Sequence, residues 1–388
     1  MMRAESIEQS LRRRFPAIEQ VDEKFLVVGG AIRDLLLALS PIDVDFVGKD
    51  ARGEAERFAS RTGGRLVELG REPLATWRIA TGRRLYDFTE QIGGSIEADL
   101  GRRDFTINAI ALDRAEPRLI DPFGGAAAID RREIAVVRDQ NLTDDPLRML
   151  RAVRFAATYG FGIESRTHEA IRNRADDISL VAPERVHGEM KTIIGSRRAA
   201  EALELMEELR LDLPLIGGAP CADVLAALRA VPEPDSLLGF SILLHSRSGE
   251  EIEAFAVRWR WSTAARRTIA RAVALFQALQ GSDREERDLV ILLYDAGEVA
   301  ARLASRMLRA FGEESRSDPI DEILERRARD VFTPTPLLGG AEIGKLTGIP
   351  VGPEIGRLKR ALVEAQLRGD VHSEEEAVTL VRTLGGSS

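Results

Sequence analysis

The sequence has little cysteine and histidine: 388 residues contain one Cys, Cys221, and four His. A single thiol excludes an intramolecular disulfide framework and any multi-cysteine zinc or iron–sulfur site. The histidines are too dispersed to form a pair on one helix. Any metal is therefore expected to be held by carboxylate oxygens.

Lysine and long apolar runs are also scarce. Only five of the 55 basic residues are lysines, and the formal net charge is −8. A nucleic acid would therefore have to bind a local basic surface rather than the field of the whole molecule. No run approaches the roughly 20 apolar residues of a membrane helix, and the N-terminus lacks a signal-peptide core. With 44% hydrophobic residues, the composition predicts a folded cytoplasmic protein of two or more packed units.

The pattern of apolar residues changes near Arg138. Before it, short runs such as 24–28, 43–47, 65–69, 76–80 and 86–88 read as strands, and four or five of them would make one sheet. After it, apolar residues recur every three or four positions, which predicts helices at 144–159, 165–175 and 183–194. We therefore expect an α+β head followed by an all-α remainder.

Two acidic residues on one predicted strand are the first candidates for chemistry. Asp43 and Asp45 are two residues apart, so their carboxylates share a face and can reach one divalent ion. Upstream, Gly29 and Gly30 end an apolar strand and can bring backbone N–H groups against a phosphate. Together they indicate phosphates and Mg²⁺. Taken singly, each motif would be a tight turn or a solvated edge strand.

Asp87, on another predicted strand, could supply a third carboxylate for a two-metal arrangement. A strand-end acid exposed to water is an alternative of nearly equal weight.

Arginines follow in two further motifs. Arg102 and Arg103 precede Asp104 and Asn108, and paired guanidinium groups suit triphosphate or ribose, although an arginine pair is usually just surface. On the predicted helix 144–159, Asp145, Arg148 and Arg151 fall on roughly one face. An ordinary ion pair would look the same.

The acid and guanidinium could also read a nucleobase. Cytosine and adenine present an exocyclic NH₂ beside an unprotonated ring nitrogen, so a carboxylate accepts from the first and a guanidinium donates to the second. Uracil and guanine reverse that order. Such a pair would select CTP and ATP without a template.

In order and spacing these motifs resemble the class II nucleotidyltransferases, which comprise the tRNA CCA-adding enzymes and the bacterial poly(A) polymerases. The resemblance covers residues 25–195 and is carried by Gly29-Gly30-x-x-Arg33-Asp34, Asp43-x-Asp45, Arg102-Arg103-Asp104-Phe105-Thr106-x-Asn108-Ala109, Asp121-Pro122-Phe123-Gly124-Gly125, Asp144-Asp145-Pro146-x-Arg148 and Pro183-Glu184-Arg185.

The resemblance implies four parts: a catalytic head with a small, mostly antiparallel sheet (1–138), a base-selecting neck (139–200), a body (201–330) and a tRNA-binding tail (331–388). It implies that Asp43 and Asp45 are catalytic carboxylates that hold metal, and Asp87 is the third catalytic carboxylate that we expect from its strand position. The expected nucleotide-binding residues are Gly29, Gly30, Arg33, Arg102, Arg103, Asp104, Asn108, Asp145, Arg148, Arg151 and Arg154. In the tail, Arg357, Lys359 and Arg360 would contact RNA. The tRNA 3′ hydroxyl would attack CTP or ATP and release pyrophosphate.

Two departures from the family bear on the product. Arg102 is only 57 positions after Asp45, and the segment 87–99 carries no insertion, so the flexible loop associated with the switch to A looks missing. This favours an enzyme that stops after CC. Asp144 stands where CCA-adding enzymes more often have Glu, and some A-adding relatives also have Asp there, which keeps addition of a terminal A open. A full CCA-adding enzyme is a further alternative. A poly(A) polymerase and a non-catalytic RNA-binding protein on an inactive fold are the remaining alternatives.

Overall fold

The computed structural model describes residues 4–70, 75–280 and 284–386. The chain divides into two compact units: Met1–Ile193 with Ala202–Ala219, and Ile194–Glu201 with Pro220–Ser388. The proposed division into four parts is finer than this and stays a prediction. No described helix is long and apolar enough to cross a bilayer.

A mixed sheet of seven described strands forms the centre of the head, in the order β3-β4-β5-β2-β1-β6-β7. The strands are β1 (Leu26–Val28), β2 (Asp43–Gly48), β3 (Arg65–Leu69), β4 (Thr76–Thr81), β5 (Arg84–Glu90), β6 (Ala111–Asp113) and β7 (Arg118–Ile120). Only β2 and β5 pair in parallel. The expected α+β head with a mostly antiparallel sheet is confirmed, but the expected strand number was too low, because β6 and β7 have three residues each and show no alternation.

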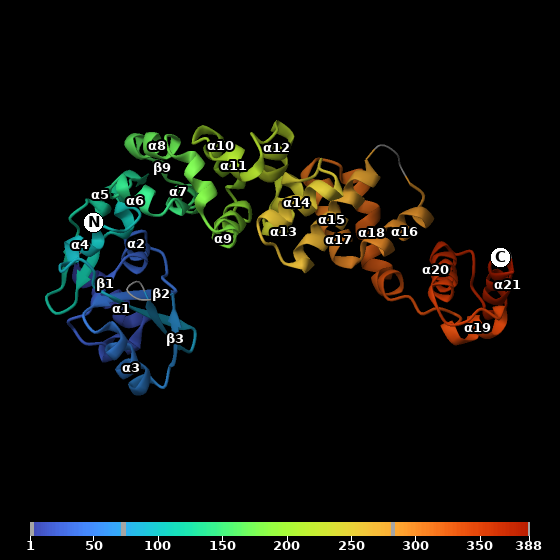
Figure 1. Cartoon of the computed structure of the whole chain (residues 1–388), viewed down its shortest axis with the longest axis horizontal. Coiled ribbons are helices and arrows are strands. Elements are labelled where there is room, and N and C mark those ends of the chain that lie inside the picture. Colours follow the sequence, from blue (N-terminus) through green and yellow to red (C-terminus); the bar gives the residue numbers. More distant parts are fainter. Residues whose placement is uncertain (1–3, 71–74, 281–283, 387–388) are drawn as a thin grey trace. The chain divides into compact units, whose positions relative to one another are not determined.

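Alternation along β2 separates the core from the site. Val44 and Phe46 are fully buried, and Phe46 stacks on Phe88 of β5 at a ring-centroid distance of 5.0 Å. Phe58 of α3 (Ala51–Thr62) packs on Phe88 from the same side. Helix α3 therefore covers one face of the sheet (Figure 1). Because side chains alternate, Asp43 and Asp45 lie on the other face.

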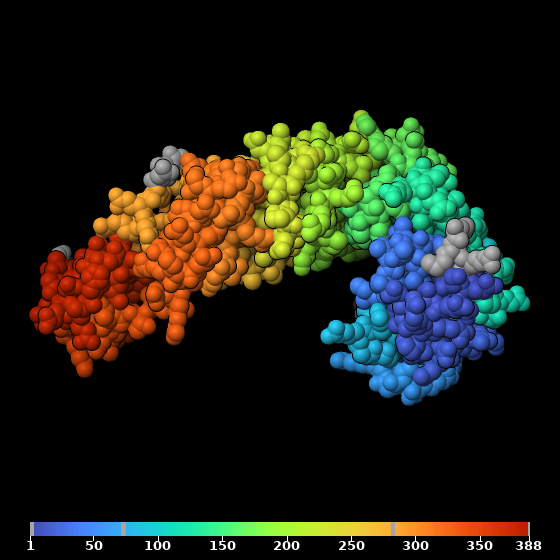
Figure 2. All heavy atoms as spheres, turned by 180° about the vertical axis from the view of Figure 1, so that it is seen from behind, coloured from blue at the N-terminus to red at the C-terminus, as the bar shows by residue number. Residues whose placement is uncertain are grey.

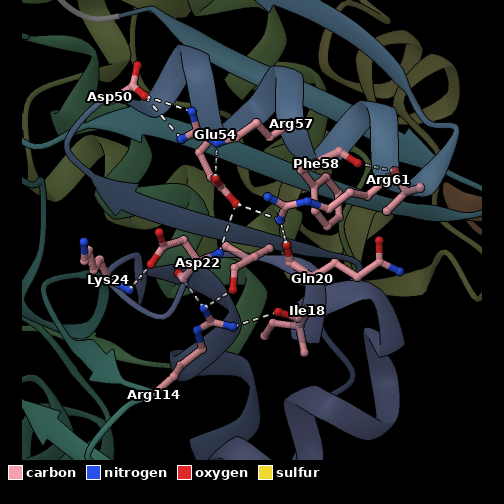
Figure 3. Close-up of polar contacts among 12 residues, drawn as sticks. Ile18, Gln20, Asp22, Lys24, Asp50, Glu54, Arg57, Phe58, Arg61 and Arg114 are labelled. Atoms are coloured by element: carbon pink, nitrogen blue, oxygen red, sulfur yellow. Dashed lines mark hydrogen bonds and ion pairs between the residues drawn. The ribbon is translucent and has the colours of Figure 1, made fainter.

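Two buried charged groups fix the segment that leads into β1 (Figure 3). The Arg114 guanidinium donates to the carbonyl oxygens of Ile18, Val21 and Asp22 at 2.8, 3.0 and 2.8 Å. The Glu54 carboxylate accepts the Asp22 N–H at 3.0 Å. Buried backbone groups need such partners. The chain before the glycine turn is thereby tied both to β6 and to α3.

The first unit also contains, wholly or with most of their residues, helices that precede, connect and follow these strands. They are α1 (Ala4–Arg14), η1 (Pro16–Gln20), α2 (Gly30–Leu36), α4 (Ile96–Leu100), η2 (Thr106–Asn108), α5 (Gly125–Arg131), α6 (Gln140–Asp144), α7 (Leu147–Tyr159), α8 (Ser165–Arg172), η3 (Ala175–Leu180), α9 (Pro183–Ile194), α10 (Ala199–Glu208) and α11 (Asp212–Ile216). A parallel pair, β8 (Glu133–Ile134) and β9 (Gly162–Ile163), lies among them.

The predicted helix 144–159 is wrong at its start. Asp144 ends α6, Asp145 is extended with φ −146° and ψ 94°, and α7 begins only at Leu147. The cause is Pro146, since the residue before a proline is sterically excluded from helical backbone angles. Asp145 therefore lies between two helices rather than in the first turn of one.

Among the described residues of the second unit, the regular elements are all helices, joined by loops. Its helices are α12 (Ala222–Ala230), α13 (Ser236–Leu243), α14 (Gly249–Arg258), α15 (Thr263–Leu279), α16 (Glu286–Ala296), α17 (Glu298–Ala310), α18 (Glu314–Phe332), α19 (Gly340–Thr347), α20 (Pro353–Arg368) and α21 (Glu374–Gly385). The last three share a core that includes Ile343, Leu358 and Val381, and their atoms form one packed group, red in Figure 2.

Candidate active site

A cavity of about 470 Å³ opens on the side of β2 that carries the two aspartates. Twelve of the residues predicted from the sequence line it: Gly29, Gly30, Arg33, Asp43, Asp45, Arg103, Asp104, Asn108, Asp145, Arg148, Arg151 and Arg154. Leu147, Phe155 and Arg185 complete the lining and were not among the predicted site residues. The cavity thus joins the end of the sheet to helix α7.

The Asp43 and Asp45 carboxylates concentrate negative charge on this side of β2. The pKa of Asp45 is raised to about 7: burial is the largest cause, the Arg103 guanidinium opposes it, and the Asp43 and Asp87 carboxylates add to it. Such a carboxyl fits a cation site, because a bound cation would stabilise the charged form that burial disfavours. Among the described residues no cluster of three or more Asp, Glu, His or Cys side chains forms a complete metal cage.

Asp87 is adjacent to the pair but lies outside the cavity lining. It is opposite Asp45 on the parallel strand β5 and is only 4% exposed. Both its oxygens accept from Arg78 of β4, at 2.8 and 2.6 Å. The Arg78 guanidinium offsets the charge of Asp87 but leaves a lone pair on each carboxylate oxygen, and the role of Asp87 as a third catalytic carboxylate stays a prediction.

The glycine turn is shaped around Arg103. Gly29 has φ +74°, and a Cβ at this position would lie 2.8 Å from the Arg103 Nη1. Helix α2 begins directly after it at Gly30. A side chain at position 29 would therefore be strained by the positive φ and would displace the Arg103 guanidinium.

Arg33, which is part of the cavity lining, is held by several partners. It donates to Asp34 at 2.9 and 2.7 Å and to the Asn108 Oδ1 at 2.6 Å. Its guanidinium lies 4.9 Å from the Tyr159 ring centroid and 5.3 Å from that of Phe155. Most of its hydrogen-bonding capacity is used within the protein, so its main contribution to a ligand is charge.

Asp104 connects the same network to α7. Burial alone would raise the pKa of Asp104, but Arg151, with contacts of 2.9 and 2.6 Å, and Asn108, with one of 2.9 Å, lower it below its usual range. Arg151 and Arg154 also share Glu189 of α9, at 3.6 and 2.5 Å. These arginines are therefore anchored.

Arg148 keeps more of its donors available. Its described hydrogen bond is a long one, from Nη1 to the Arg103 carbonyl oxygen at 3.4 Å. Burial lowers the pKa of its guanidinium. A desolvated guanidinium with available donors is suited to a hydrogen-bonding ligand.

Asp145 is paired with Arg185 of α9, which donates to its two carboxylate oxygens at 3.2 and 2.8 Å. The Asp145 carboxylate also accepts the Leu147 N–H at 3.3 Å. A base that uses Asp145 must share it with Arg185 or displace it. Arg185 belongs to the motif Pro183-Glu184-Arg185, but the sequence does not show that its partner is Asp145.

The remaining predicted residues lie elsewhere. Arg102 lines a second cavity of about 240 Å³ instead of the first. In α20, Arg357 pairs with Glu354 at 2.5 Å, and Arg360 pairs with Asp295 at 2.7 Å. Lys359 is exposed. Their predicted role in RNA binding stays a prediction.

Asp121 has a structural role. Its carboxylate accepts the N–H groups of Gly125 and Ala126 at 2.7 and 2.9 Å, at the start of α5.

Paired aspartates, a glycine turn and several arginines around one cavity have the chemistry that the transfer of a nucleotide requires. Residues 25–135 match the family described as "Poly A polymerase head domain", and residues 160–216 match "Probable RNA and SrmB- binding site of polymerase A". The class of the protein is therefore nucleotidyltransferase.

Three relatives specify the family. The chain is 32% identical to the A-adding tRNA nucleotidyltransferase of Deinococcus radiodurans, over 95% of this chain and 98% of the relative. It is 33% identical to the CC-adding tRNA nucleotidyltransferase of Thermus thermophilus, over 90% and 91% of the two chains. The crystal structure of the Bacillus stearothermophilus CCA-adding enzyme in complex with CTP matches with a TM-score of 0.76 at 28% identity, covering 97% of each chain. The chain belongs to the tRNA nucleotidyltransferase family.

Proposed function

We propose that this enzyme adds two C residues from CTP to the 3′ end of tRNA. The observation that carries the proposal is the single cavity that joins Asp43 and Asp45 to Asp145 and Arg148. One pair has the chemistry to act at the phosphates and the other the chemistry to read the base. In the reaction, the RNA 3′ oxygen forms a bond to the α-phosphorus of CTP, the bond to pyrophosphate breaks and the hydroxyl loses its proton.

Asp43 and Asp45 would hold the Mg²⁺. The raised pKa of Asp45 supports a cation at this position. Bound there, Mg²⁺ supplies positive charge that favours ionisation of the attacking hydroxyl and neutralises phosphate oxygens.

The arginines would hold the triphosphate. Arg103, against the glycine turn, contributes a guanidinium next to Asp45, and Arg33 contributes charge from below. Preorganised cations of this kind stabilise charge that develops on phosphate oxygens.

Asp145 and Arg148 would read the base. Cytosine offers an N4 amino donor and an N3 acceptor, which complement a carboxylate and a guanidinium. Uracil offers an oxygen and an N–H at the same two positions, so both contacts become mismatched. The fit to cytosine and adenine alike is the reason that ATP is the second candidate nucleotide.

A stop after CC is supported by the short connection that follows β5. Strand β5 ends at Glu90 and α4 begins at Ile96, so that only residues 91–95 connect them. There is no room in this connection for the long loop that is associated with adding A.

Addition of the terminal A is the second candidate. Asp144 in place of Glu keeps it open, and the A-adding relative is as similar to this chain as the CC-adding one, at 32% against 33% identity. The helical tail, 331–388, with Arg357, Lys359 and Arg360, would contact the tRNA in either case.

One assay distinguishes these products. Transfer RNAs that end at the discriminator base, at C and at CC are each incubated with a single NTP, and the products are sized. Two additions from CTP and none from ATP on the CC end are expected. One A on the CC end only would identify an A-adding enzyme, both activities a CCA-adding enzyme, and long ATP-only tails a poly(A) polymerase.

A further inference from the structure

A second cavity adjoins the cavity that Asp43, Asp45, Asp145 and Arg148 line, which we call the nucleotide cavity after the proposed function. It has a volume of about 240 Å³ and is lined by Thr89, Glu90, Ile92, Asp99, Arg102, Arg103 and Arg148. Arg103 and Arg148 also line the first cavity, so these two side chains separate the two spaces. The second cavity is about half the size of the first, which suits one nucleoside with one phosphate better than a second triphosphate.

The strand register places this cavity beside the reacting groups. On β5, Thr89 is two residues beyond Asp87 and directly opposite Val47, which is two residues beyond Asp45 on β2. Thr89 therefore lies on the same face of the sheet as Asp45. Strand β5 is on one side of β2, and β1, which leads to the glycine turn, is on the other. The two cavities thus flank Asp45.

The charges in the second cavity favour an anion. Its two acids are already engaged: Glu90 accepts the Asp50 and Ala51 N–H groups at 3.1 and 2.9 Å, and Asp99 accepts the Ile92 N–H at 3.2 Å. Arg102 is exposed, and among the residues that the structure describes its guanidinium makes no ion pair. An available guanidinium on the rim matches a phosphate.

We propose that the second cavity receives the 3′-terminal nucleotide of the RNA acceptor and that Arg102 binds the phosphate on its 5′ side. The assignment rests on the proposed function, because the acceptor oxygen must meet the α-phosphate of CTP beside Asp45. Half-buried Ile92 offers an apolar contact to the nucleoside. Arg102 and Arg103, although adjacent in sequence, then serve the two different substrates.

The first test measures both substrates on one variant. In Arg102→Ala, the KM for a tRNA ending at the discriminator should rise about tenfold while the KM for CTP stays unchanged, as expected for the loss of one charged hydrogen bond at a rim position. Anisotropy of a labelled acceptor RNA without nucleotide should show the same loss. Arg83→Ala is the matched control, since Arg83 is an exposed arginine in the turn at the opposite end of β5. Thermal unfolding should agree among all three proteins.

The second test changes the phosphate itself. An acceptor with an uncharged methylphosphonate at its last linkage should bind the parent enzyme about tenfold more weakly than the unmodified acceptor does. The Arg102→Ala variant should bind the two acceptors with equal affinity. Two independent, additive losses would overturn the proposal. A change in the KM for CTP or in inhibition by pyrophosphate, with acceptor binding intact, would assign Arg102 to the triphosphate instead. A parent that extends no tRNA with any NTP would refute the function itself, and this assignment with it.

Discussion

Replacement of Arg148 tests the base-reading geometry most directly. Arg148→Ala removes a guanidinium that lines the nucleotide cavity and has one described hydrogen bond, of 3.4 Å, within the protein. Little protein structure depends on that contact. The loss should therefore fall on the ligand rather than on the fold.

The magnitude follows from the kind of bond that is lost. A charge-assisted hydrogen bond contributes about 1.5–3 kcal/mol, or roughly 10- to 150-fold in an equilibrium or rate ratio. The ratio of kcat/KM for CTP to that for UTP should fall by this factor. We propose that Arg103 and Arg33 hold the triphosphate, so the loss of activity that CTP and UTP share should be smaller than the loss of discrimination between them.

The assay is single-nucleotide addition to a tRNA that ends at the discriminator, with each NTP in turn. Arg148→Lys is the informative control, because lysine keeps the charge and loses the planar fork of donors. It should restore most of the shared loss but not the discrimination. An unchanged CTP to UTP ratio in Arg148→Ala, with the fold intact, would refute the assignment of Arg148 to the base.

Three further predictions concern the metal, the turn and the cap. A cation binds the ionised carboxyl, and the pKa of Asp45 is raised to about 7, so Mg²⁺ affinity should increase about tenfold per pH unit below 7 and level off above it. Calorimetry should detect proton release when Mg²⁺ binds, and the Asp45→Asn variant should lose this pH dependence. Gly29→Ala should cost about 1–2 kcal/mol of stability and lose far more activity than Gly82→Ala, because both have positive φ but only a Cβ at Gly29 meets Arg103; steady-state kinetics and thermal unfolding compare them. Asp121→Ala should lower the free energy of unfolding in urea by about 1 kcal/mol and leave the KM for CTP unchanged.

Local patterns predicted the parts of the site that depend on neighbours in sequence. The alternation along β2 is enough to place Asp43 and Asp45 on one face, and an apolar run that stops at two glycines is enough to place a turn there. Both inferences need only the two-residue period of a strand and the backbone freedom of glycine. Neither requires knowledge of the tertiary structure.

The pairing of charges was not predictable to the same degree. Asp145 and Arg185 are 40 residues apart, and Asp104 and Arg151 are 47 apart, in a chain with 50 arginines from which to choose. The Arg78 to Asp87 pair did leave a signal in the sequence. A two-residue turn at 82–83 pairs Thr81 with Arg84, and this register places residue 78 opposite residue 87. Reading the hairpin in this way would have shown that Asp87 has a neutralising partner.

The sequence predicted that Asp145 and Arg148 would lie one turn apart on the same helix. They do lie one turn apart, although α7 begins only at Leu147, after Asp145. Pro146 keeps Asp145 extended, yet the Arg148 N–H donates to the Asp145 carbonyl oxygen at 3.0 Å, which closes one turn around the proline. The Leu147 N–H donates to the Asp145 carboxylate, which holds that side chain at the start of α7. A proline in the first turn of a helix loses no hydrogen bond, because its N–H would have had no partner within the helix. The proline therefore takes the acidic residue out of the helix, where Arg185 can reach it, while the arginine stays on the first turn. A regular helix through Asp145 would have kept the same spacing in sequence but bound that residue's backbone into the helix.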